Sequence, residues 1–192
     1  MARTRDAVEA LIVLDVVTTF EHEDGERLLA SMRERVSALR RAVVHARGRL
    51  PVVYVNDAHG CWDGDARGLV ARARSGVGGD VVAALAPAPG DRFLFKPRYS
   101  ALDGTALAHV LAELAVTRLV LAGAATEMCV AQTAIHAREQ DLQVTVLRDA
   151  CATVRAEDER ISLEYLEHVT GSVILCVEDW ATRGGDRPVG AD

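Results

Sequence analysis

The hydrophobic and polar positions along the chain follow two alternating patterns. Short uninterrupted apolar runs, typical of strands buried on both faces of a parallel sheet, alternate with stretches in which apolar residues recur every three or four positions, typical of helices. The apolar runs predict strands at residues 10–15, 52–56, 93–96, 117–121, 144–147 and 172–177. The helical spacing predicts helices within residues 29–43 and 107–114, after residue 126, and within 157–168.

This alternation predicts the α/β fold class. Strand, helix and next strand form right-handed βαβ units, which build a parallel sheet covered by helices on both faces. We therefore expect a three-layer α/β/α structure with a six-stranded, mostly parallel, Rossmann-like sheet. Residues 57–89 have the weakest periodicity and predict a long loop with one or two short helices. Residues 1–183 are expected to form a single domain, followed by a flexible, Gly-rich tail at 184–192.

Composition excludes several function classes. The chain has 192 residues, of which 49% are hydrophobic, and a net charge of −6 without a basic cluster, which argues against a nucleic-acid partner. No apolar run approaches the roughly 20 residues needed to span a bilayer, and the N-terminus lacks the apolar stretch of a signal peptide. A cytoplasmic location is therefore expected. The cysteines at positions 61, 129, 151 and 176 form no CxxC pair, so free thiols are expected.

One cysteine stands where a buried strand passes into a helix. Residues 123–130 read Gly-Ala-Ala-Thr-Glu-Met-Cys-Val, with Thr126 as the expected N-cap. Cys129 then falls at about the third helical position, where free backbone N–H groups and the helix dipole favour thiolate over thiol. Cys129 is therefore a candidate nucleophile.

Three residues able to do chemistry follow predicted strands. Asp15 ends the first strand, Lys96 ends the third, and Cys129 lies just beyond the fourth. The carboxyl ends of parallel strands meet at one edge of the sheet, so an acid or base, a cation and a nucleophile are expected together. Each residue alone is weak evidence, because a strand-end Asp commonly caps a helix and most buried cysteines are inert. Their combination predicts a catalytic site.

These motifs resemble the isochorismatase-like cysteine hydrolase superfamily, which includes nicotinamidases, N-carbamoylsarcosine amidohydrolase, ureidoacrylate hydrolases and isochorismatases. The resemblance runs from Leu11 to about Val177. It rests on Leu-Ile-Val-Leu-Asp followed by Phe20, on Phe-Lys-Pro-Arg-Tyr-Ser-Ala-Leu at 95–102, and on the motif at 123–130. Val-Asn-Asp-Ala-His-Gly-Cys-Trp at 55–62 is similar to a loop of members whose substrates are mostly unassigned. The fold of the family is the three-layer parallel sheet expected above.

The resemblance implies a catalytic triad of Asp15, Lys96 and Cys129. Cys129 would attack an acyl carbon, Asp15 would receive the thiol proton, and Lys96 would hold the cysteine partly ionised near neutral pH. The backbone N–H groups of Ala125 and Cys129 would form the oxyanion hole, beside a cis peptide bond between Ala124 and Ala125. The implied activity is hydrolysis of a C–N bond in a small amide, ureide or carbamoyl compound through a Cys129 thioester.

The sequence also departs from the family. Many members read Asp-Met-Gln-Asn-Asp-Phe where this chain reads Asp-Val-Val-Thr-Thr-Phe at 15–20, so a polar pair is missing at Val17 and Thr19. Nicotinamidases hold a metal with Asp-x-His and a further His. Asp57 and His59 match the first pair, but no other His lies before His109. Because zinc takes at least three protein ligands, no metal and no other cofactor are expected.

The substrate pocket is expected to include residues from several segments, with ordinary packing as the alternative for the aromatic ones. They are Phe20, Asp57, His59, Trp62 and Tyr99. The expected partner is a small-molecule substrate. The resemblance further implies a homo-oligomer, a dimer or larger, in which a neighbouring subunit can close the pocket.

Two other functions remain open. An isochorismatase-type hydrolase of a vinyl ether needs no nucleophile, so the presence of Cys129 disfavours it. A catalytically inactive binding or scaffold protein would have no need to keep Asp15, Lys96 and Cys129 together.

Overall fold

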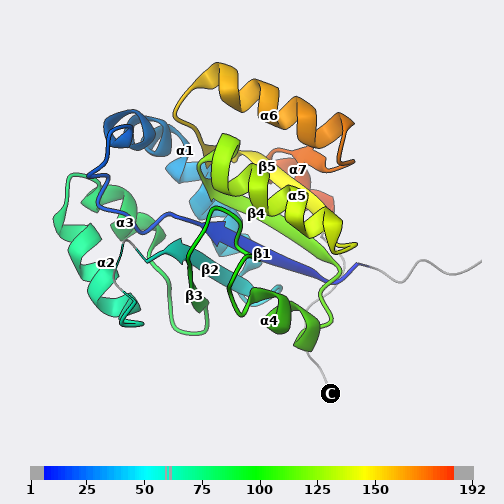
Figure 1. Ribbon diagram of the computed structural model, residues 1–192, viewed down its shortest axis with the longest axis horizontal. Helices are drawn as coiled ribbons and strands as arrows, with labels where there is room; N and C mark the ends of the chain where they lie inside the picture. The colour runs from blue at the N-terminus through cyan, green and yellow to red at the C-terminus, as the bar shows by residue number, and fades with distance from the viewer. Residues whose placement is uncertain (1–6, 59, 61, 184–192) are drawn as a thin grey trace, which may run out of the picture.

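A computed structural model describes residues 7–58, 60 and 62–183. In this part of the chain six strands form one sheet in the order β3-β2-β1-β4-β5-β6, and every neighbouring pair is parallel (Figure 1). The strands are β1 (Glu9–Leu14), β2 (Val52–Asp57), β3 (Arg92–Lys96), β4 (Arg118–Ala124), β5 (Gln143–Ala152) and β6 (Val173–Leu175). The predicted α/β fold with a parallel sheet is confirmed.

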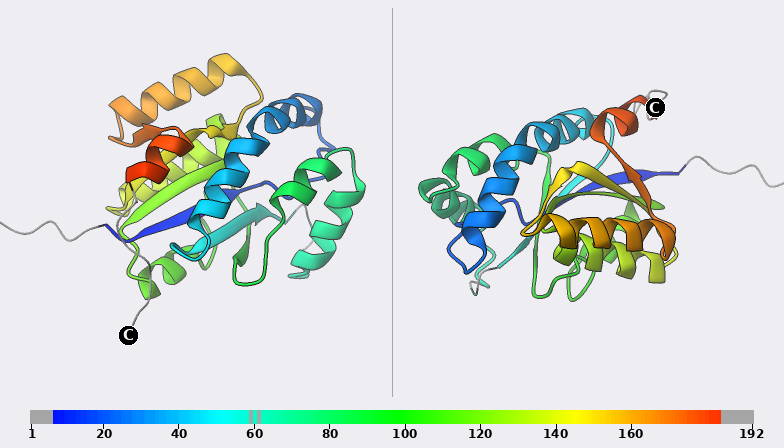
Figure 2. Two further views of the ribbon diagram at one scale, coloured as in Figure 1. Left: turned by 180° about the vertical axis from the view of Figure 1, so that it is seen from behind. Right: turned by 90° about the horizontal axis from the view of Figure 1, so that it is seen from above.

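Helices cover both faces of the sheet, as Figure 2 shows. The helices are α1 (Gly25–Ala46), α2 (Ala66–Ser75), α3 (Gly79–Leu85), α4 (Leu107–Glu113), the π-helical turn η1 (Thr126–Val130), α5 (Ala131–Glu139), α6 (Ala156–His168) and α7 (Val177–Arg183). Helices α1, α3 and α7 pack on one face, and α4, α5 and α6 pack on the other. Among the described helices, none has the length and apolar character needed to cross a membrane.

The two cores explain the unbroken apolar run of β1. Successive side chains of a strand point to opposite faces. Leu11 and Val13 accordingly enter the core beneath α1, whereas Ile12 and Leu14 enter the core beneath α4 and α5. Because both faces are covered, no position from Ala10 to Leu14 is exposed to solvent.

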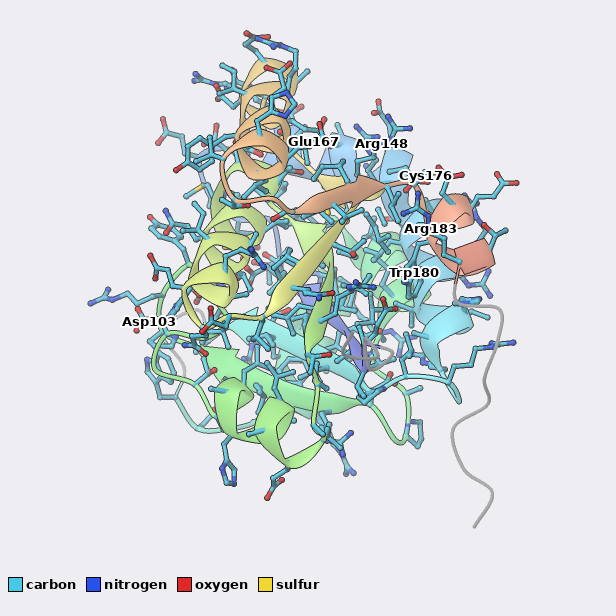
Figure 3. The ribbon with its side chains drawn as sticks, turned by 90° about the vertical axis from the view of Figure 1, so that its right-hand side faces the viewer. Asp103, Arg148, Glu167, Cys176, Trp180 and Arg183 are labelled. Carbon is cyan, nitrogen blue, oxygen red and sulfur yellow. The ribbon has the colours of Figure 1, made fainter. Side chains whose placement is uncertain are left out.

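The C-terminal part of the chain differs from the prediction. Residues 172–177 were expected to form one strand, but β6 is only three residues long and α7 begins at Val177. Trp180, labelled in Figure 3, is buried and donates a hydrogen bond from Nε1 to Oε2 of Glu9 at 3.1 Å. A seven-residue helix shows too little periodicity to be recognised, and its contact with Glu9 joins opposite ends of the sequence. The tail predicted at 184–192 lies outside the described residues.

Gly123 allows β4 to approach β1 at the end of the sheet. It pairs with Leu14, and its φ of 121° lies in the region that favours glycine. A Cβ at this position would lie 2.1 Å from the carbonyl oxygen of Leu14. Only glycine therefore permits this backbone spacing immediately before the turn that carries Cys129.

We expect Gly123→Ala to lower the free energy of unfolding by about 3 kcal/mol, because backbone strain and a backbone clash add together. The measurement is urea denaturation followed by circular dichroism. Gly171→Ala is the matched control, since Gly171 also has a positive φ, 68°, but open space around its Cβ position. The control should lose only about 1 kcal/mol. Equal losses in the two variants would contradict the steric explanation.

Candidate active site

The structure brings Asp15, Lys96 and Cys129 together at the carboxyl edge of the sheet. Asp15 follows β1, Lys96 ends β3, and Cys129 lies in η1 after β4. Nζ of Lys96 is 2.9 Å from Oδ2 of Asp15 and donates a hydrogen bond to Sγ of Cys129 at 3.4 Å. It also donates to the carbonyl oxygen of Arg98 at 3.1 Å. The ammonium group is thus the centre of the cluster.

The backbone turns sharply at Asp15. Its φ of 49° is a left-handed conformation, which is uncommon for a residue with a side chain. The N–H of Asp15 donates to the carbonyl oxygen of Val55 at 3.1 Å, so the residue stays attached to β2. Oδ1 of Asp15 accepts a hydrogen bond from the backbone N–H of Asp57 at 2.7 Å. The end of β2 therefore holds both the backbone and the carboxylate of Asp15.

The turn that carries Cys129 is π-helical. The peptide bond between Ala124 and Ala125 is cis, and the N–H groups of Met128 and Val130 both donate to the carbonyl oxygen of Ala125. Thr126, expected as an N-cap, instead donates its hydroxyl to the carbonyl oxygen of Ala152 at 3.1 Å. The prediction of a Thr126 cap is therefore wrong, because the neighbouring strand end of β5 takes the hydroxyl.

Glu127 attaches the same turn to the segment after β5. Oε1 accepts from the N–H of Val154 at 2.8 Å, and Oε2 accepts from the hydroxyl of Thr153 at 2.8 Å. Sequence reasoning missed these partners, since they lie 26 and 27 positions away and no local pattern relates them to Glu127.

Burial and charge shift the pKa of all three clustered groups. Burial raises the pKa of Asp15, although Lys96 opposes the shift. Burial by itself lowers the pKa of Lys96, but the attraction of Asp15 and Cys129 outweighs it and the pKa lies above its ordinary value. Burial, with the negative charge of Asp15, raises the pKa of Cys129 to about 12. The lysine therefore keeps its charge, and the thiol keeps its proton until a base removes it.

The expectation that Lys96 holds Cys129 partly ionised near neutral pH is therefore wrong for the free protein. The lysine does lower the pKa of the thiol, but burial and the carboxylate of Asp15 together have the larger effect. The size of these two effects on the pKa could not be judged from the sequence, because burial of the thiol and its distance from Asp15 both depend on how closely separate strand ends pack.

The predicted pocket residues lie in different environments. Phe20 is only 4% exposed and sits in the core against Leu29 and Gly78, which is a packing position instead of an open pocket wall. Packing was the alternative that the sequence left open for Phe20, and the sequence could not show that Leu29 and Gly78 lie against its ring. Trp62 and Tyr99 are 62% and 54% exposed, so both lie on the surface.

Only Asp57 of the predicted Asp57 and His59 pair lies within the described residues. The backbone of Asp57 contacts the carboxylate of Asp15, as described above, whereas His59 and Cys61 lie outside the described residues. The contribution of His59 to the pocket stays a prediction.

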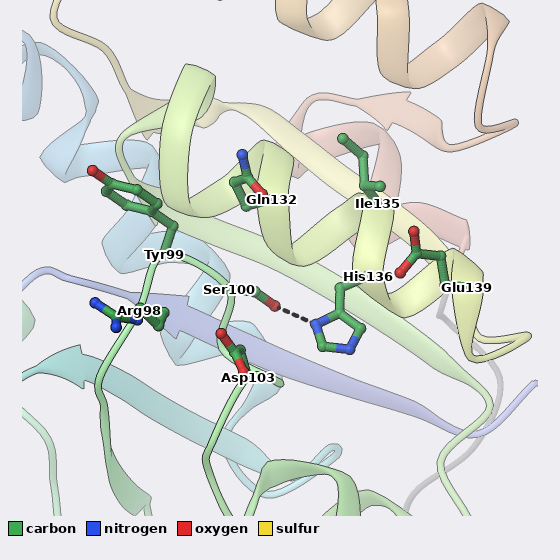
Figure 4. A pocket seen from close by; sticks show the side chains of 8 residues that line it. All are labelled: Arg98, Tyr99, Ser100, Asp103, Gln132, Ile135, His136 and Glu139. Atoms are coloured by element: carbon green, nitrogen blue, oxygen red, sulfur yellow. Dashed lines mark hydrogen bonds between the residues drawn. The ribbon is translucent and has the colours of Figure 1, made fainter.

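A hollow of about 330 Å³ lies on the flank of the molecule, between α5 and the segment after Lys96 (Figure 4). Within it, Oγ of Ser100 and Nδ1 of His136 are 3.0 Å apart. Its lining consists of Arg98, Tyr99, Ser100, Asp103, Gln132, Ile135, His136 and Glu139. Asp15, Lys96 and Cys129 do not line it, but Arg98, whose carbonyl oxygen accepts a hydrogen bond from Lys96, does, so the hollow adjoins the charged cluster.

Comparison with known proteins identifies the family. The sequence profile described as the isochorismatase domain matches residues 9–178 of this chain. The chain belongs to the isochorismatase family. An isochorismatase family protein of Bacillus subtilis, YaaI, is 32% identical over 173 residues, which cover 90% of this chain and 96% of the relative.

Other relatives carry names that describe action on amides. The chain is similar to N-carbamoylsarcosine amidase from Thermoplasma acidophilum, with a TM-score of 0.70 and 29% identity over 89% of this chain and 97% of that one. The ureidoacrylate amidohydrolase of Methylobacterium radiotolerans is 35% identical over 115 residues, covering 58% of this chain and 45% of the relative. The chain is accordingly an isochorismatase-family hydrolase.

The electrostatics of the cluster predict how Cys129 reacts with iodoacetamide. A thiol with a pKa of about 12 should be alkylated slowly at pH 7, and faster as the pH rises. In Asp15→Asn the charge that raises this pKa is gone, so the pKa should fall and alkylation at a given pH should become faster. Rates between pH 7 and 10 are followed by peptide mass spectrometry.

Cys176 provides the internal reference in the same digests, because it follows β6, the edge strand that β5 separates from β4. Its rate should be the same in the wild-type chain and in Asp15→Asn. Slower alkylation of Cys129 in Asp15→Asn would contradict the stated effect of the carboxylate.

Proposed function

We propose that this protein hydrolyses a C–N bond of a small amide, ureide or carbamoyl compound through a thioester on Cys129. One observation carries the proposal. A single ammonium group, that of Lys96, contacts a carboxylate at 2.9 Å and a thiol at 3.4 Å at the edge of the sheet. A base, a cation and a nucleophile in this arrangement fit nucleophilic acyl transfer.

Acylation begins with transfer of the thiol proton of Cys129 to the carboxylate of Asp15. The sulfur forms a bond to the acyl carbon, and the carbonyl oxygen takes the negative charge. Collapse of this intermediate breaks the C–N bond, and the departing nitrogen receives the proton from Asp15. The raised pKa of Asp15 suits this role, because a more basic carboxylate is a better proton acceptor for a thiol.

Lys96 stabilises the negative charge that passes between Asp15 and Cys129. Its raised pKa keeps the ammonium protonated, and its hydrogen bond to the carbonyl oxygen of Arg98 fixes its direction. We propose the backbone N–H groups of Ala125 and Cys129 as donors to the oxyanion. One such donor typically contributes roughly 3 kcal/mol to transition-state stabilisation.

Deacylation uses the same groups with water as the nucleophile. Asp15 accepts a proton from water as the oxygen attacks the thioester carbon. The C–S bond then breaks, the sulfur of Cys129 regains a proton, and the acid product leaves. No group beyond the substrate, water and the residues of the cluster is needed for the two steps to balance.

The proposed substrate class draws support from the relatives named for ureidoacrylate and N-carbamoylsarcosine. The loop after β1 argues against assigning the substrate of any one relative to this protein. Val16 and Val17 are fully buried and Thr18 is 5% exposed, so this loop offers few polar side chains to a ligand. The polar groups of the substrate must therefore find partners elsewhere around Cys129.

We expect Cys129→Ala to lose activity by at least about 10⁴-fold. When catalytic residues act as a unit, removal of the nucleophile alone abolishes nearly all of the catalysis. A panel of small amides, ureides and carbamoyl compounds is tested for ammonia or amine release. Active compounds are then incubated with the wild-type protein, and an acyl adduct on the Cys129 peptide is sought by mass spectrometry. The melting temperature of Cys129→Ala should stay close to that of the wild type.

Cys176→Ala is the control, since it removes a half-buried thiol whose contact is with Asp179 after β6. It should retain full activity. Vinyl ether hydrolysis that persists in Cys129→Ala would favour the isochorismatase-type reaction instead. Binding of the panel without any turnover would favour a non-catalytic protein.

A further inference from the structure

Asn56 is a fully buried amide within the motif at 55–62, and no catalytic or binding role was predicted for it from the sequence. It lies in β2, next to Asp57, and has no exposed surface. Its Oδ1 accepts a hydrogen bond from the N–H of Val17 at 3.1 Å, and its Nδ2 donates to the carbonyl oxygen of Val17 at 2.8 Å. The side chain thus pairs with both polar groups of one backbone residue, in the manner of an added strand.

Val17 is only two positions after Asp15. Because Asp15 is held in a left-handed conformation, which costs roughly 1–2 kcal/mol for a residue with a Cβ, the segment after it needs external support. Residues of β2 provide that support at three points. The carbonyl of Val55 and the N–H of Asp57 bind Asp15 itself, and the side chain of Asn56 binds the loop beyond it.

Asn56 makes its contact with the segment after Asp15 through its side chain, so the contact can be removed without disturbing the backbone bonds of Val55 and Asp57. Its two polar ends are used by Val17, which leaves it poorly suited to bind substrate. Its contact instead fixes where the chain leaves Asp15, and hence how the carboxylate faces Lys96.

We infer that Asn56 is a positioning residue, which holds the carboxylate of Asp15 against Lys96 and Cys129 by bracing the backbone of Val17. The inference rests on the proposed function for its effect on turnover. The geometry of the cluster, however, is tested without any substrate.

The experiment compares Asn56→Ala with Tyr54→Phe. Tyr54 lies two positions earlier on the same face of β2, is equally buried, and donates its hydroxyl to the carbonyl oxygen of Leu85 at 2.9 Å. Each variant therefore removes buried hydrogen bonding from β2, but only Asn56→Ala removes the contact with Val17, in the segment after Asp15. Asn56→Ser, which leaves a small polar group in place, is measured as well in case the alanine variant does not fold.

The first readout is iodoacetamide alkylation of Cys129 between pH 7 and 10. A displaced Asp15 no longer opposes ionisation of the thiol, so the rate in Asn56→Ala should rise toward that of Asp15→Asn. The rise should be about threefold for each unit by which the pKa falls, because the thiolate fraction grows about tenfold while each thiolate becomes less nucleophilic. Tyr54→Phe should match the wild type, and the rate at Cys176 should not change in any variant. An Asn56→Ala profile equal to that of Tyr54→Phe would overturn the inference.

The second readout is turnover of any amide identified by the panel above. Asn56→Ala should lose roughly 10- to 100-fold in kcat with little change in KM, since a misplaced base slows the chemical step more than it weakens binding. A loss confined to KM would overturn the positioning role. Full activity of Cys129→Ala would contradict the proposed function alone, because the alkylation profiles would still decide the role of Asn56.

Discussion

The ion pair between Asp15 and Lys96 is the interaction on which the site depends. Lys96 is 1% exposed, and a charge so deeply buried is costly unless a partner of opposite charge lies against it. The carboxylate lies 2.9 Å away, and the carbonyl of Arg98 satisfies a further ammonium proton. The remaining direction is taken by the sulfur of Cys129. The pair thus holds the thiol of Cys129, the proposed nucleophile, against a buried positive charge.

The parallel sheet is what makes this pair possible. Asp57 and Lys96 are register partners at the ends of β2 and β3, and Leu14 and Gly123 are partners at the ends of β1 and β4. Four neighbouring strands therefore finish within a few residues of one another. The site takes one reactive side chain from each of three of these strand ends, while β2 supplies the backbone and amide contacts that fix Asp15.

For the proposed hydrolysis, the raised pKa of the Cys129 thiol favours proton transfer during the attack over a thiolate formed beforehand. Burial raises the pKa of both Asp15 and Cys129, and the attraction of its partners raises that of Lys96. In that proposed step, one proton passes from the sulfur to the carboxylate as the bond to carbon forms, and the ammonium charge does not change. Such a step needs an accurately placed carboxylate, and β2 contacts that of Asp15 through the N–H of Asp57, while Val55 and Asn56 hold the backbone on either side of it.

The sequence by itself determined the layers, the parallel sheet and the three residues of the cluster. Strand and helix periods are local properties, and residues that follow parallel strands must meet at one edge of the sheet. Only the tertiary structure decided the protonation of Cys129, the buried place of Phe20, the hydrogen bond from Thr126 to Ala152 and the brace formed by Asn56. Each of these depends on burial and on contacts between residues far apart in the chain, such as the 39 positions that separate Asn56 from Val17. Local sequence patterns cannot predict such contacts, because they form only when the strands pack side by side.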